Sequence, residues 1–467
     1  MNSVVTRFAP SPTGFLHAGN YRTAVFAYLF AKHTGGKFIV RIEDTDATRS
    51  KKEYEENIFE TLAWLALPAD ETYRQSEHRA RHRELLEKLV AEDKAYVSKE
   101  TPKKEGDREE VIRFRNPGGT RTFTDVIHGD ITTGVSDLND FIIARSYDEP
   151  VFHFAVVVDD ADEKVTHVIR GGDHISNTAR QMLIRSALGF AEPLYAHLPL
   201  IMDSNHKKLS KRYGAKALTE YRDQGILPEA LLNYLAFLGW NPGDDREYLS
   251  KEELMNAFEL SRVQKGSAVF DEVKLLSVNQ HWMRKLSDVD FLAHVLDVVR
   301  PTSDVGRTTS LNSEVIKKAV PLLKERARSF GEAREMLSGE LSCLFNEPVL
   351  DRNQLIIKEP AERPGMTKIA LESLLEPLKA LPTGRQAFQE GVSAEMVKEA
   401  IMPLADAEEA KGLPAGKAGK GGRGAVLWPL RYALSGADRS PDPFTLISIL
   451  GGEESISRVQ KAIAILQ

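Results

Sequence analysis

The segment from Arg7 to Asp46 constrains the fold more than any other part of this 467-residue sequence. Val4 to Phe8 is predicted to be a short buried strand, and Pro10 to Gly14 is a turn rich in helix breakers. Asn20 to His33 has the apolar content of a helix, and Lys37 to Ile42 is predicted to be a second strand. A strand, a helix and another strand in this order predict the start of a parallel α/β sheet.

The first turn of this helix is a candidate binding site for a polyphosphate. A helix that opens near residues 18–21 presents backbone amides and the positive end of its dipole to the preceding loop. His17 adds a side-chain donor, and Gly19 lets a purine or ribose ring approach the backbone. Each residue alone is weak evidence, because a lone His at such a junction is more often a helix cap and a lone Gly is usually part of a turn.

A second candidate element lies far along the chain, in the basic run from Lys207 to Arg212. It follows a predicted strand, Ala196 to Met202, and a turn, Asp203 to His206. A single basic run is normally a solvated surface. The two elements together are more informative than either one.

Two elements of the sequence, about one domain apart, resemble the HIGH and KMSKS signatures of class I aminoacyl-tRNA synthetases. The first consists of His17, Gly19 and Asn20, and the second of Lys208, Leu209, Ser210, Lys211 and Arg212. Four further segments are similar to bacterial glutamyl-tRNA synthetases, so the resemblance covers nearly the whole chain. These are His167 to Gln181, Lys207 to Ala215, Gly225 to Trp240 and, more thinly, Trp428 to Gly436.

The resemblance implies an α/β fold: a class I synthetase Rossmann-like catalytic domain with a mixed insertion and an all-α anticodon-binding region at the C-terminal end. It also implies ATP and Mg²⁺ as cofactors. His17, Lys208 and Lys211 are expected to be catalytic through the phosphates of ATP. The expected ATP-binding residues are His17, Gly19, Asn20, Ile201, Lys208, Ser210 and Lys211.

Glutamate carries a second carboxylate, which is costly to bury unless a fixed cation pairs with it. The resemblance assigns this task to Arg7 and Arg170, and it assigns the substrate ammonium to Glu43. The alternative for both arginines is a structural salt bridge with Glu43 or Asp44. The other family positions of the amino-acid or adenosine pocket are Ala9, Ser11, Phe152, Asp173, His174, Leu200 and Ile201.

Three features depart from the family pattern. Relatives usually have Thr-Tyr where this chain has Val151 and Phe152, so a hydroxyl expected near the substrate is absent. An acidic residue is common where this chain has Gly172, and the region 99–112 is short. Loss of one neutral hydrogen bond would weaken glutamate binding by about 0.5–1.5 kcal/mol.

Composition is that of an ordinary globular protein, with 42% hydrophobic and 28% charged residues and a net charge of -6. No apolar run approaches a membrane span, and the N-terminus has no signal-peptide pattern, so the cytoplasm is the expected location. The single cysteine, Cys343, is expected in the core and excludes a cysteine-cluster zinc site, so no structural zinc is expected. Candidate basic segments for binding nucleic acid are residues 99–121, 206–216 and 411–431.

The chain is divided into five predicted regions. These are the first half of the Rossmann domain (1–95), an extended acceptor-binding insertion (96–165), the second half with the KLSKR loop (166–245), a helical stem-contact region (246–325) and a helical anticodon-binding region (326–467). Phe154 to Val158 is predicted to be an apolar strand ending in Asp159 and Asp160. Pro228 is predicted to begin a helix, and Ser250 with Glu253 to form a capping box.

The expected partners are L-glutamate, ATP and tRNA(Glu), with tRNA(Gln) as an open alternative, and the protein is expected to act as a monomer. Arg326 is a candidate reader of an anticodon base, although a solvated arginine is at least as common on a helix. Glutaminyl enzymes fit less well because the tail has a helical pattern, and the shorter glutamyl-queuosine enzymes lack such a tail. A noncatalytic tRNA-binding paralogue and a general nucleotidyltransferase are further alternatives, which adenylate formation would test.

Overall fold

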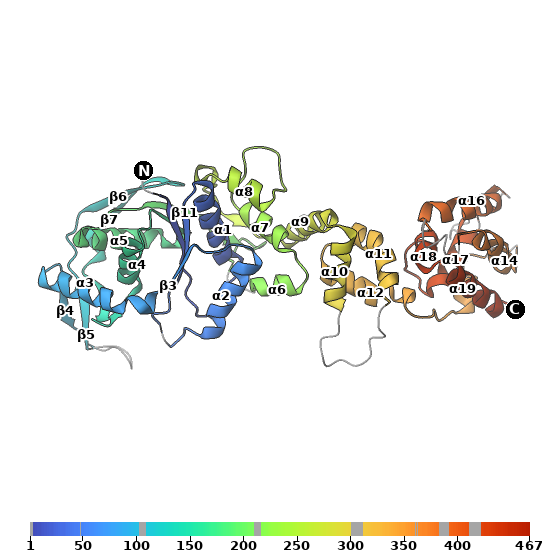
Figure 1. Ribbon diagram of the computed structural model, residues 1–467, viewed down its shortest axis with the longest axis horizontal. Coiled ribbons are helices and arrows are strands. Elements are labelled where there is room, and N and C mark those ends of the chain that lie inside the picture. Colours follow the sequence, from blue (N-terminus) through green and yellow to red (C-terminus); the bar gives the residue numbers. More distant parts are fainter. Residues whose placement is uncertain are drawn as a thin grey trace. The chain divides into compact units, whose positions relative to one another are not determined.

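The computed structural model describes residues 3–46, 48–101, 109–209, 216–299, 312–359, 361, 363–382, 392–410 and 422–467 (Figure 1). The chain divides into two compact units, residues 1–282 and 283–467. The five narrower boundaries predicted from the sequence remain predictions.

The first unit is built on a seven-stranded sheet in the order β3-β2-β1-β10-β11-β6-β7. All neighbouring pairs are parallel except β6 with β7. The strands are β1 (Val5–Phe8), β2 (Lys37–Ile42), β3 (Glu71–Arg74), β6 (Thr120–Asp125), β7 (Gly129–Gly134), β10 (His167–Gly171) and β11 (Leu194–Leu198). The predicted parallel α/β domain is confirmed.

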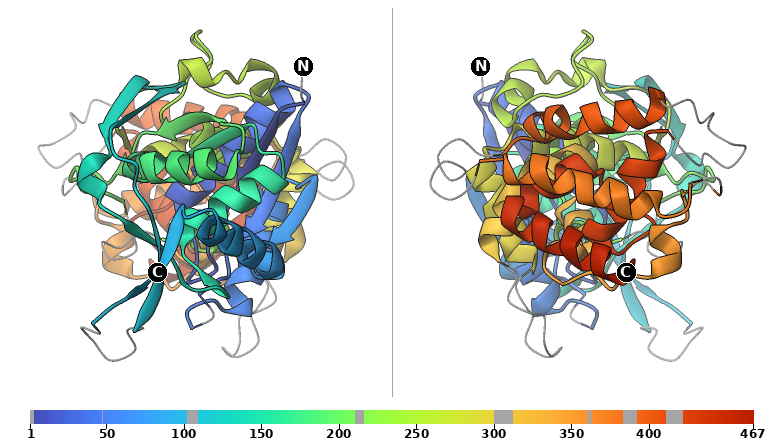
Figure 2. Two further views of the ribbon diagram at one scale, coloured as in Figure 1. Left: turned by 90° about the vertical axis from the view of Figure 1, so that its left-hand side faces the viewer. Right: turned by 90° about the vertical axis from the view of Figure 1, so that its right-hand side faces the viewer.

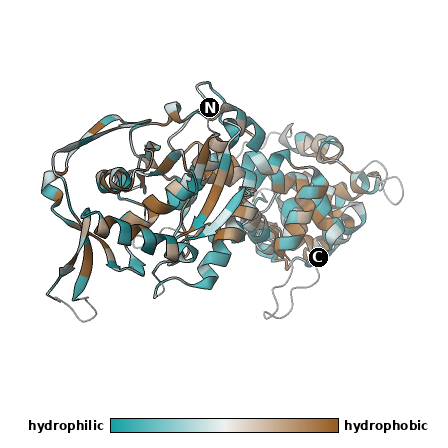
Figure 3. Cartoon of the chain, turned by 60° about the vertical axis from the view of Figure 1, so that its left-hand side comes forward, coloured by the Kyte–Doolittle hydropathy of each residue, from teal (hydrophilic) through white to brown (hydrophobic). Residues whose placement is uncertain are grey.

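Helices cover both faces of this sheet. Helix α1 (Ala18–His33) packs on β1, β2 and β10. On the other side, Met182 of α5 (Ile175–Leu188) packs with Val5, Ile39 and Val168 from the strands. Hydrophobic residues colour much of the sheet brown in Figure 3, as expected for strands buried on both faces.

The insertion between β3 and β10 forms an antiparallel sheet in the order β4-β5-β8-β9. Its strands are β4 (Ala95–Lys99), β5 (Glu110–Phe114), β8 (Phe141–Ser146) and β9 (Glu149–Pro150). The extended character predicted for residues 96–165 is confirmed for these strands, but residues 152–162 of this range form a helix. The β6–β7 hairpin of this insertion instead joins the central sheet, where Asp125 pairs with Tyr195 of β11.

Two secondary-structure predictions were wrong. Residues 154–158 lie in helix α4 (Phe152–Asp162), because a short apolar run that is buried all round suits a helix as well as a strand. The strand predicted at 196–202 is split into β11 and β12 (Ile201–Met202), which pairs with β13 (Ala268–Val269). Pro199 between them has no N–H for a ladder hydrogen bond.

The remaining described helices of the first unit surround the sheet or follow it. They include α7, where Pro228 is the first helical residue, and α8, where Ser250 and Glu253 form the predicted capping box. The helices are α2 (Lys52–Trp64), α3 (Arg79–Ala91), α6 (Leu218–Asp223), α7 (Pro228–Ala236), α8 (Lys251–Ala257) and α9 (Glu272–Lys285), whose last residues enter the second unit.

The second unit is helical throughout its described residues, as the sequence predicts. Figure 2 shows its last helices, orange to red, packed together, and Cys343 is buried among them as expected. The helices are α10 (Asp288–Val299), α11 (Ser313–Arg326), α12 (Phe330–Ser338), α13 (Arg352–Leu355), α14 (Met366–Lys379), α16 (Ala394–Ala410), α17 (Gly424–Ser435), α18 (Pro443–Leu450) and α19 (Gly452–Ile465).

Candidate active site

A cavity of about 630 Å³ opens at the carboxyl ends of β1 and β10. The chain runs outward from β1 to β2 and β3 on one side and from β10 to β11 on the other, so this point is the topological switch of the sheet. Open α/β sheets bind ligands at such points. The structure brings fourteen of the sixteen predicted ATP and amino-acid pocket residues to this cavity: Arg7, Ala9, Ser11, His17, Gly19, Asn20, Glu43, Phe152, Arg170, Asp173, His174, Leu200, Ile201 and Lys208.

Two predicted residues, Ser210 and Lys211, lie outside the described residues. The described segment before them lines the cavity, and the described segment after them contacts a residue of the cavity. Before the gap, the Leu209 N–H donates to Ile201 O at 2.8 Å, which closes a hairpin that carries Lys208. After the gap, Ala217 forms a bridge with His17.

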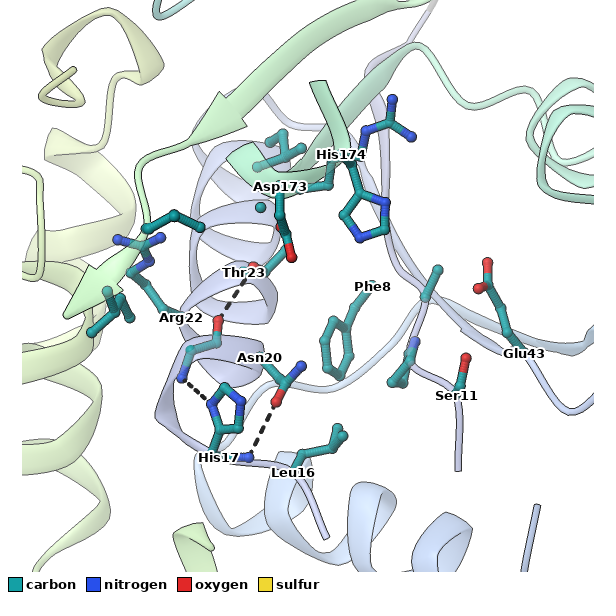
Figure 4. Close-up of a pocket in the computed structure, with 18 of the residues that line it drawn as sticks. Phe8, Ser11, Leu16, His17, Asn20, Arg22, Thr23, Glu43, Asp173 and His174 are labelled. Atoms are coloured by element: carbon teal, nitrogen blue, oxygen red, sulfur yellow. Dashed lines mark hydrogen bonds between the residues drawn. The ribbon is translucent and has the colours of Figure 1, made fainter. Parts of the chain in front are cut away.

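The start of α1 is organised by His17 (Figure 4). Its Nδ1 accepts from the Gly19 N–H at 3.0 Å, and its own N–H donates to Asn20 Oδ1 at 3.2 Å. Since Nδ1 is an acceptor, the neutral imidazole carries its proton on Nε2. His17 is therefore both the helix cap and a donor group of the cavity wall.

This arrangement corrects one sequence expectation, that the amides at the helix start are unpaired. The Gly19 and Asn20 amides are not unpaired, because His17 Nδ1 and His17 O accept from them. A Cβ on Gly19 would lie 2.8 Å from His17 Cε1. Gly19 is needed for the position of the imidazole.

Arg7 and Glu43 are part of a buried ionic network. Arg7 Nε donates to Asp160 Oδ1 at 3.1 Å, and Arg41 donates to the same oxygen at 2.9 Å. Arg41 also contacts Glu43 at 3.3 Å, and burial outweighs this contact and raises the pKa of Glu43. The structural partner of Arg7 is thus Asp160 of α4, rather than Glu43 or Asp44 as the alternative had it.

Arg170 differs from Arg7, because its hydrogen bonds go to uncharged groups. Nη1 donates to Gln181 Oε1 at 2.7 Å, Nη2 to Thr178 Oγ1 at 2.7 Å and Nε to His197 Nε2 at 3.1 Å. Arg170 is 7% exposed, and burial lowers its pKa to about 10. Within the described part of the chain no carboxylate forms a salt bridge with it, so a buried cation faces the cavity.

The opposite wall is aromatic and polar. Phe152 begins α4 and contacts His174, with 5.6 Å between ring centroids. Burial lowers the pKa values of His153 and His174 to about 4, so both rings are neutral near pH 7. Figure 4 shows His174 and Asp173 across the cavity from Ser11 and Glu43.

Sequence reasoning missed several residues of this cavity. His153, Asn177 and Arg22 line it, and Asp125 and His197 support Arg170 from behind. No local pattern connects Asp125 with His197, because they are 72 positions apart and meet through strand pairing. Arg326 ends α11 in the second unit, where its Nη1 lies 3.6 Å from Glu340 Oε1.

The fold and the cavity define a class I synthetase, and comparison with family models agrees. Residues 3–110 and 98–277 match the model "tRNA synthetases class I (E and Q), catalytic domain", and residues 290–463 match "Anticodon binding domain". Among curated proteins, "Glutamate--tRNA ligase 1" of Xanthobacter autotrophicus is 38% identical over 99% of this chain and 100% of its own length. The chain belongs to the glutamate–tRNA ligase family of class I aminoacyl-tRNA synthetases.

Other relatives give the same result. "Glutamate--tRNA ligase" of Aquifex aeolicus is 43% identical over 72% of this chain and 77% of its own length. The crystal structure of a glutamate tRNA ligase from Elizabethkingia meningosepticum in complex with its amino acid has a TM-score of 0.83 and 32% identity, and each chain covers 100% of the other. No helix within the described ranges is long and apolar enough to cross a membrane.

Proposed function

We propose that this protein ligates L-glutamate to the 3' end of tRNA(Glu) through a glutamyl-adenylate, with release of diphosphate and then AMP. The observation that carries this proposal is Arg170, a buried guanidinium with hydrogen bonds to uncharged groups in the cavity that also contains His17 and Lys208. A buried cation of this kind favours an anionic ligand group. The family relationship supports glutamate as that ligand.

In the first step an oxygen of the glutamate α-carboxylate attacks the α-phosphorus of ATP, and the bond from that phosphorus to the bridging oxygen breaks. The nucleophile is already ionised, so the site supplies orientation and charge stabilisation rather than a base. His17 would donate from Nε2 to a phosphate, and the Lys208 ammonium would bind the leaving diphosphate. Ile201, Gly19 and Asn20 line the same cavity. By family resemblance, Ser210 and Lys211 would also bind ATP.

Glutamate itself would be selected by charge. Arg170, with Arg7 nearby, would bind the side-chain carboxylate, because guanidinium groups match carboxylates in geometry. Glu43 would bind the ammonium group of the substrate. Burial raises the pKa of this carboxyl group, so a cation beside it would favour the ionised form. Ala9, Ser11, Phe152 and Asp173 also line the cavity.

In the second step a ribose hydroxyl at the 3' end of the tRNA attacks the acyl carbon, and AMP leaves. The helical second unit, which matches an anticodon-binding domain, would hold the tRNA, with Arg326 as a proposed anticodon contact. We also propose that the protein acts as a monomer in the cytoplasm, where tRNA charging takes place. Acceptance of tRNA(Gln) is left to experiment.

The side chains at the nucleotide end of the cavity fit phosphate oxygens better than a metal ion. His17 and Lys208 are donors, and in the described ranges no group of three His, Cys, Asp or Glu could hold a metal. Mg²⁺ bound to nucleotides keeps most of its ligands from water and phosphate, so a dedicated protein cage is not required. Mg²⁺ would enter with ATP and neutralise part of the phosphate charge.

The test is charging of purified tRNA(Glu) and tRNA(Gln) transcripts with labelled glutamate and, separately, labelled glutamine, in the presence of ATP and Mg²⁺. Glutamate on tRNA(Glu) is the expected product. Glutamate on both transcripts would make the enzyme non-discriminating. Product with neither amino acid would overturn the proposal and favour a noncatalytic paralogue.

A further inference from the structure

Behind Arg170, a chain of hydrogen bonds runs through His197 to Asp125. Arg170 Nε donates to His197 Nε2 at 3.1 Å, and His197 Nδ1 lies 2.7 Å from Asp125 Oδ2. All three side chains are buried, with exposed fractions of 7%, 0% and 1% in that order. The cavity is lined by Arg170 alone of the three, so the other two act from behind it.

The chemistry of these contacts fixes the tautomer of His197. A carboxylate can only accept, so the proton of the imidazole is on Nδ1. The lone pair of Nε2 then faces the Arg170 Nε–H. Burial, which acts against the charged form, lowers the pKa of His197 in spite of Asp125. The neutral ring therefore accepts from Arg170 instead of repelling it.

Asp125 is itself held from several sides. Its Oδ1 accepts from the backbone N–H groups of Ile127 and His128, both at 2.9 Å, and its Oδ2 accepts from the His197 N–H at 3.0 Å. Asp125 pairs with Tyr195 where the β6–β7 hairpin joins β11. In addition, His128 Nε2 lies 3.0 Å from His197 O. This anchoring leaves the imidazole little freedom to turn.

We propose that Asp125 and His197 are positioning residues that hold the Arg170 guanidinium in the orientation that binds the substrate's carboxylate. The inference rests on the proposed function. Three of the five Arg170 N–H groups are engaged by His197, Gln181 and Thr178, which leaves two for a ligand. An acceptor on Nε fixes the rotation of the guanidinium plane, and preorganisation of this kind improves binding of one carboxylate geometry.

Two substitutions of His197 distinguish a role in positioning Arg170 from a general role in stabilising the fold. In His197→Asn the amide nitrogen can replace Nδ1 and keep the bond to Asp125, but the acceptor for Arg170 is lost. In His197→Gln the amide oxygen can replace Nε2 and keep the Arg170 bond, while the Asp125 bond is lost. Both variants are to be assayed for the KM values of glutamate and ATP during charging of tRNA(Glu), with urea midpoints as a folding control.

We expect His197→Asn to raise the KM of glutamate by about 10- to 100-fold, the usual effect of a lost hydrogen bond to a charged group. His197→Gln should stay within about threefold of the parent, and the KM of ATP should be nearly unchanged in both. In an Arg170→Ala background, His197→Asn should add no further change. Equal glutamate KM values in the two variants, or full additivity with Arg170→Ala, would overturn the positioning role. Absence of charging by the unsubstituted protein would instead refute the proposed function.

Discussion

Lys208 Nζ lies 2.9 Å from Asp173 Oδ2, so the hairpin after β12 is tied to the turn after β10 at the mouth of the cavity. Burial acts to raise the pKa of Asp173, but the hydrogen bond and the charge of Lys208, together with the other contacts of the carboxylate, outweigh burial and lower the pKa. The side chains are 51% and 46% exposed, and such ion pairs contribute about 0–1 kcal/mol. Lys208 can therefore leave Asp173 for a phosphate at little cost.

Replacement of Lys208 by Met should lower the rate of glutamyl-adenylate formation by a factor of roughly 10² to 10³, because a preorganised charge on the phosphates is lost. The rate is measured by ATP–diphosphate exchange with tRNA(Glu) present. Lys207→Met is the matched control, since Lys207 is in the same hairpin but does not line the cavity. A decrease of similar size in the control would assign the effect to the hairpin rather than to Lys208.

Gly19→Ala should impair the same step almost as much as His17→Ala. The new Cβ would lie 2.8 Å from His17 Cε1 and 3.0 Å from Nδ1, so the imidazole must move and its bond to the Gly19 N–H is lost. We expect a decrease of order 10²-fold in the exchange rate. Gly134→Ala is the control, because a Cβ there meets nothing within 4 Å. A near-normal rate in Gly19→Ala would show that the imidazole position is not critical.

Asp160→Asn should destabilise the first unit strongly. Asp160 accepts from both Arg7 and Arg41 in a buried network, and removal of one partner from such a network costs about 3–5 kcal/mol. The change is measured from the urea midpoint at pH 7. Asp148→Asn removes the partner of Arg83 in an exposed pair and should cost at most about 1 kcal/mol. Similar losses in both variants would contradict the role given to the buried network.

The secondary structure of the first unit could be predicted where local signals are strong. The Lys37 to Ile42 strand, the Pro228 helix start and the Ser250 capping box are set by a few adjacent residues, and the structure has them where the sequence places them. The strand predicted at residues 154–158 was wrong, because an apolar run can be buried as either a helix or a strand and only the tertiary fold decides between the two.

The cavity was predictable as a set of residues but not as a set of contacts. Motif resemblance selected Arg7 and Arg170 together, yet Arg7 is paired with Asp160, whereas Arg170 forms no ion pair with the carboxylates that the structure describes. That difference depends on α4 and α5, which bring distant side chains to each arginine. The position of Asp125 behind Arg170 also could not be predicted from the sequence, because it results from strand pairing between distant segments.

Finally, the stability of the protein should depend on pH through His174. Burial, reinforced by the nearby Arg170 charge, lowers its pKa from 6.5 to about 4. Between pH 6.5 and 4 the unfolded chain therefore binds a proton at this residue that the folded chain does not, so stability rises with pH and is lost as the pH falls through this range.

His174→Gln removes this titration, so the variant should lose less stability than the parent on going from pH 7 to pH 5. The expected difference between the two changes is of order 1–2 kcal/mol, read from urea midpoints at both pH values. His206→Asn is the matched control: it also removes a histidine, at an exposed turn position with φ of 58°, which Asn accepts. If His174→Gln loses as much stability as the parent between pH 7 and pH 5, the His174 imidazole is protonated in the folded protein as readily as in the unfolded chain, and the assignment of a neutral ring beside Phe152 is wrong.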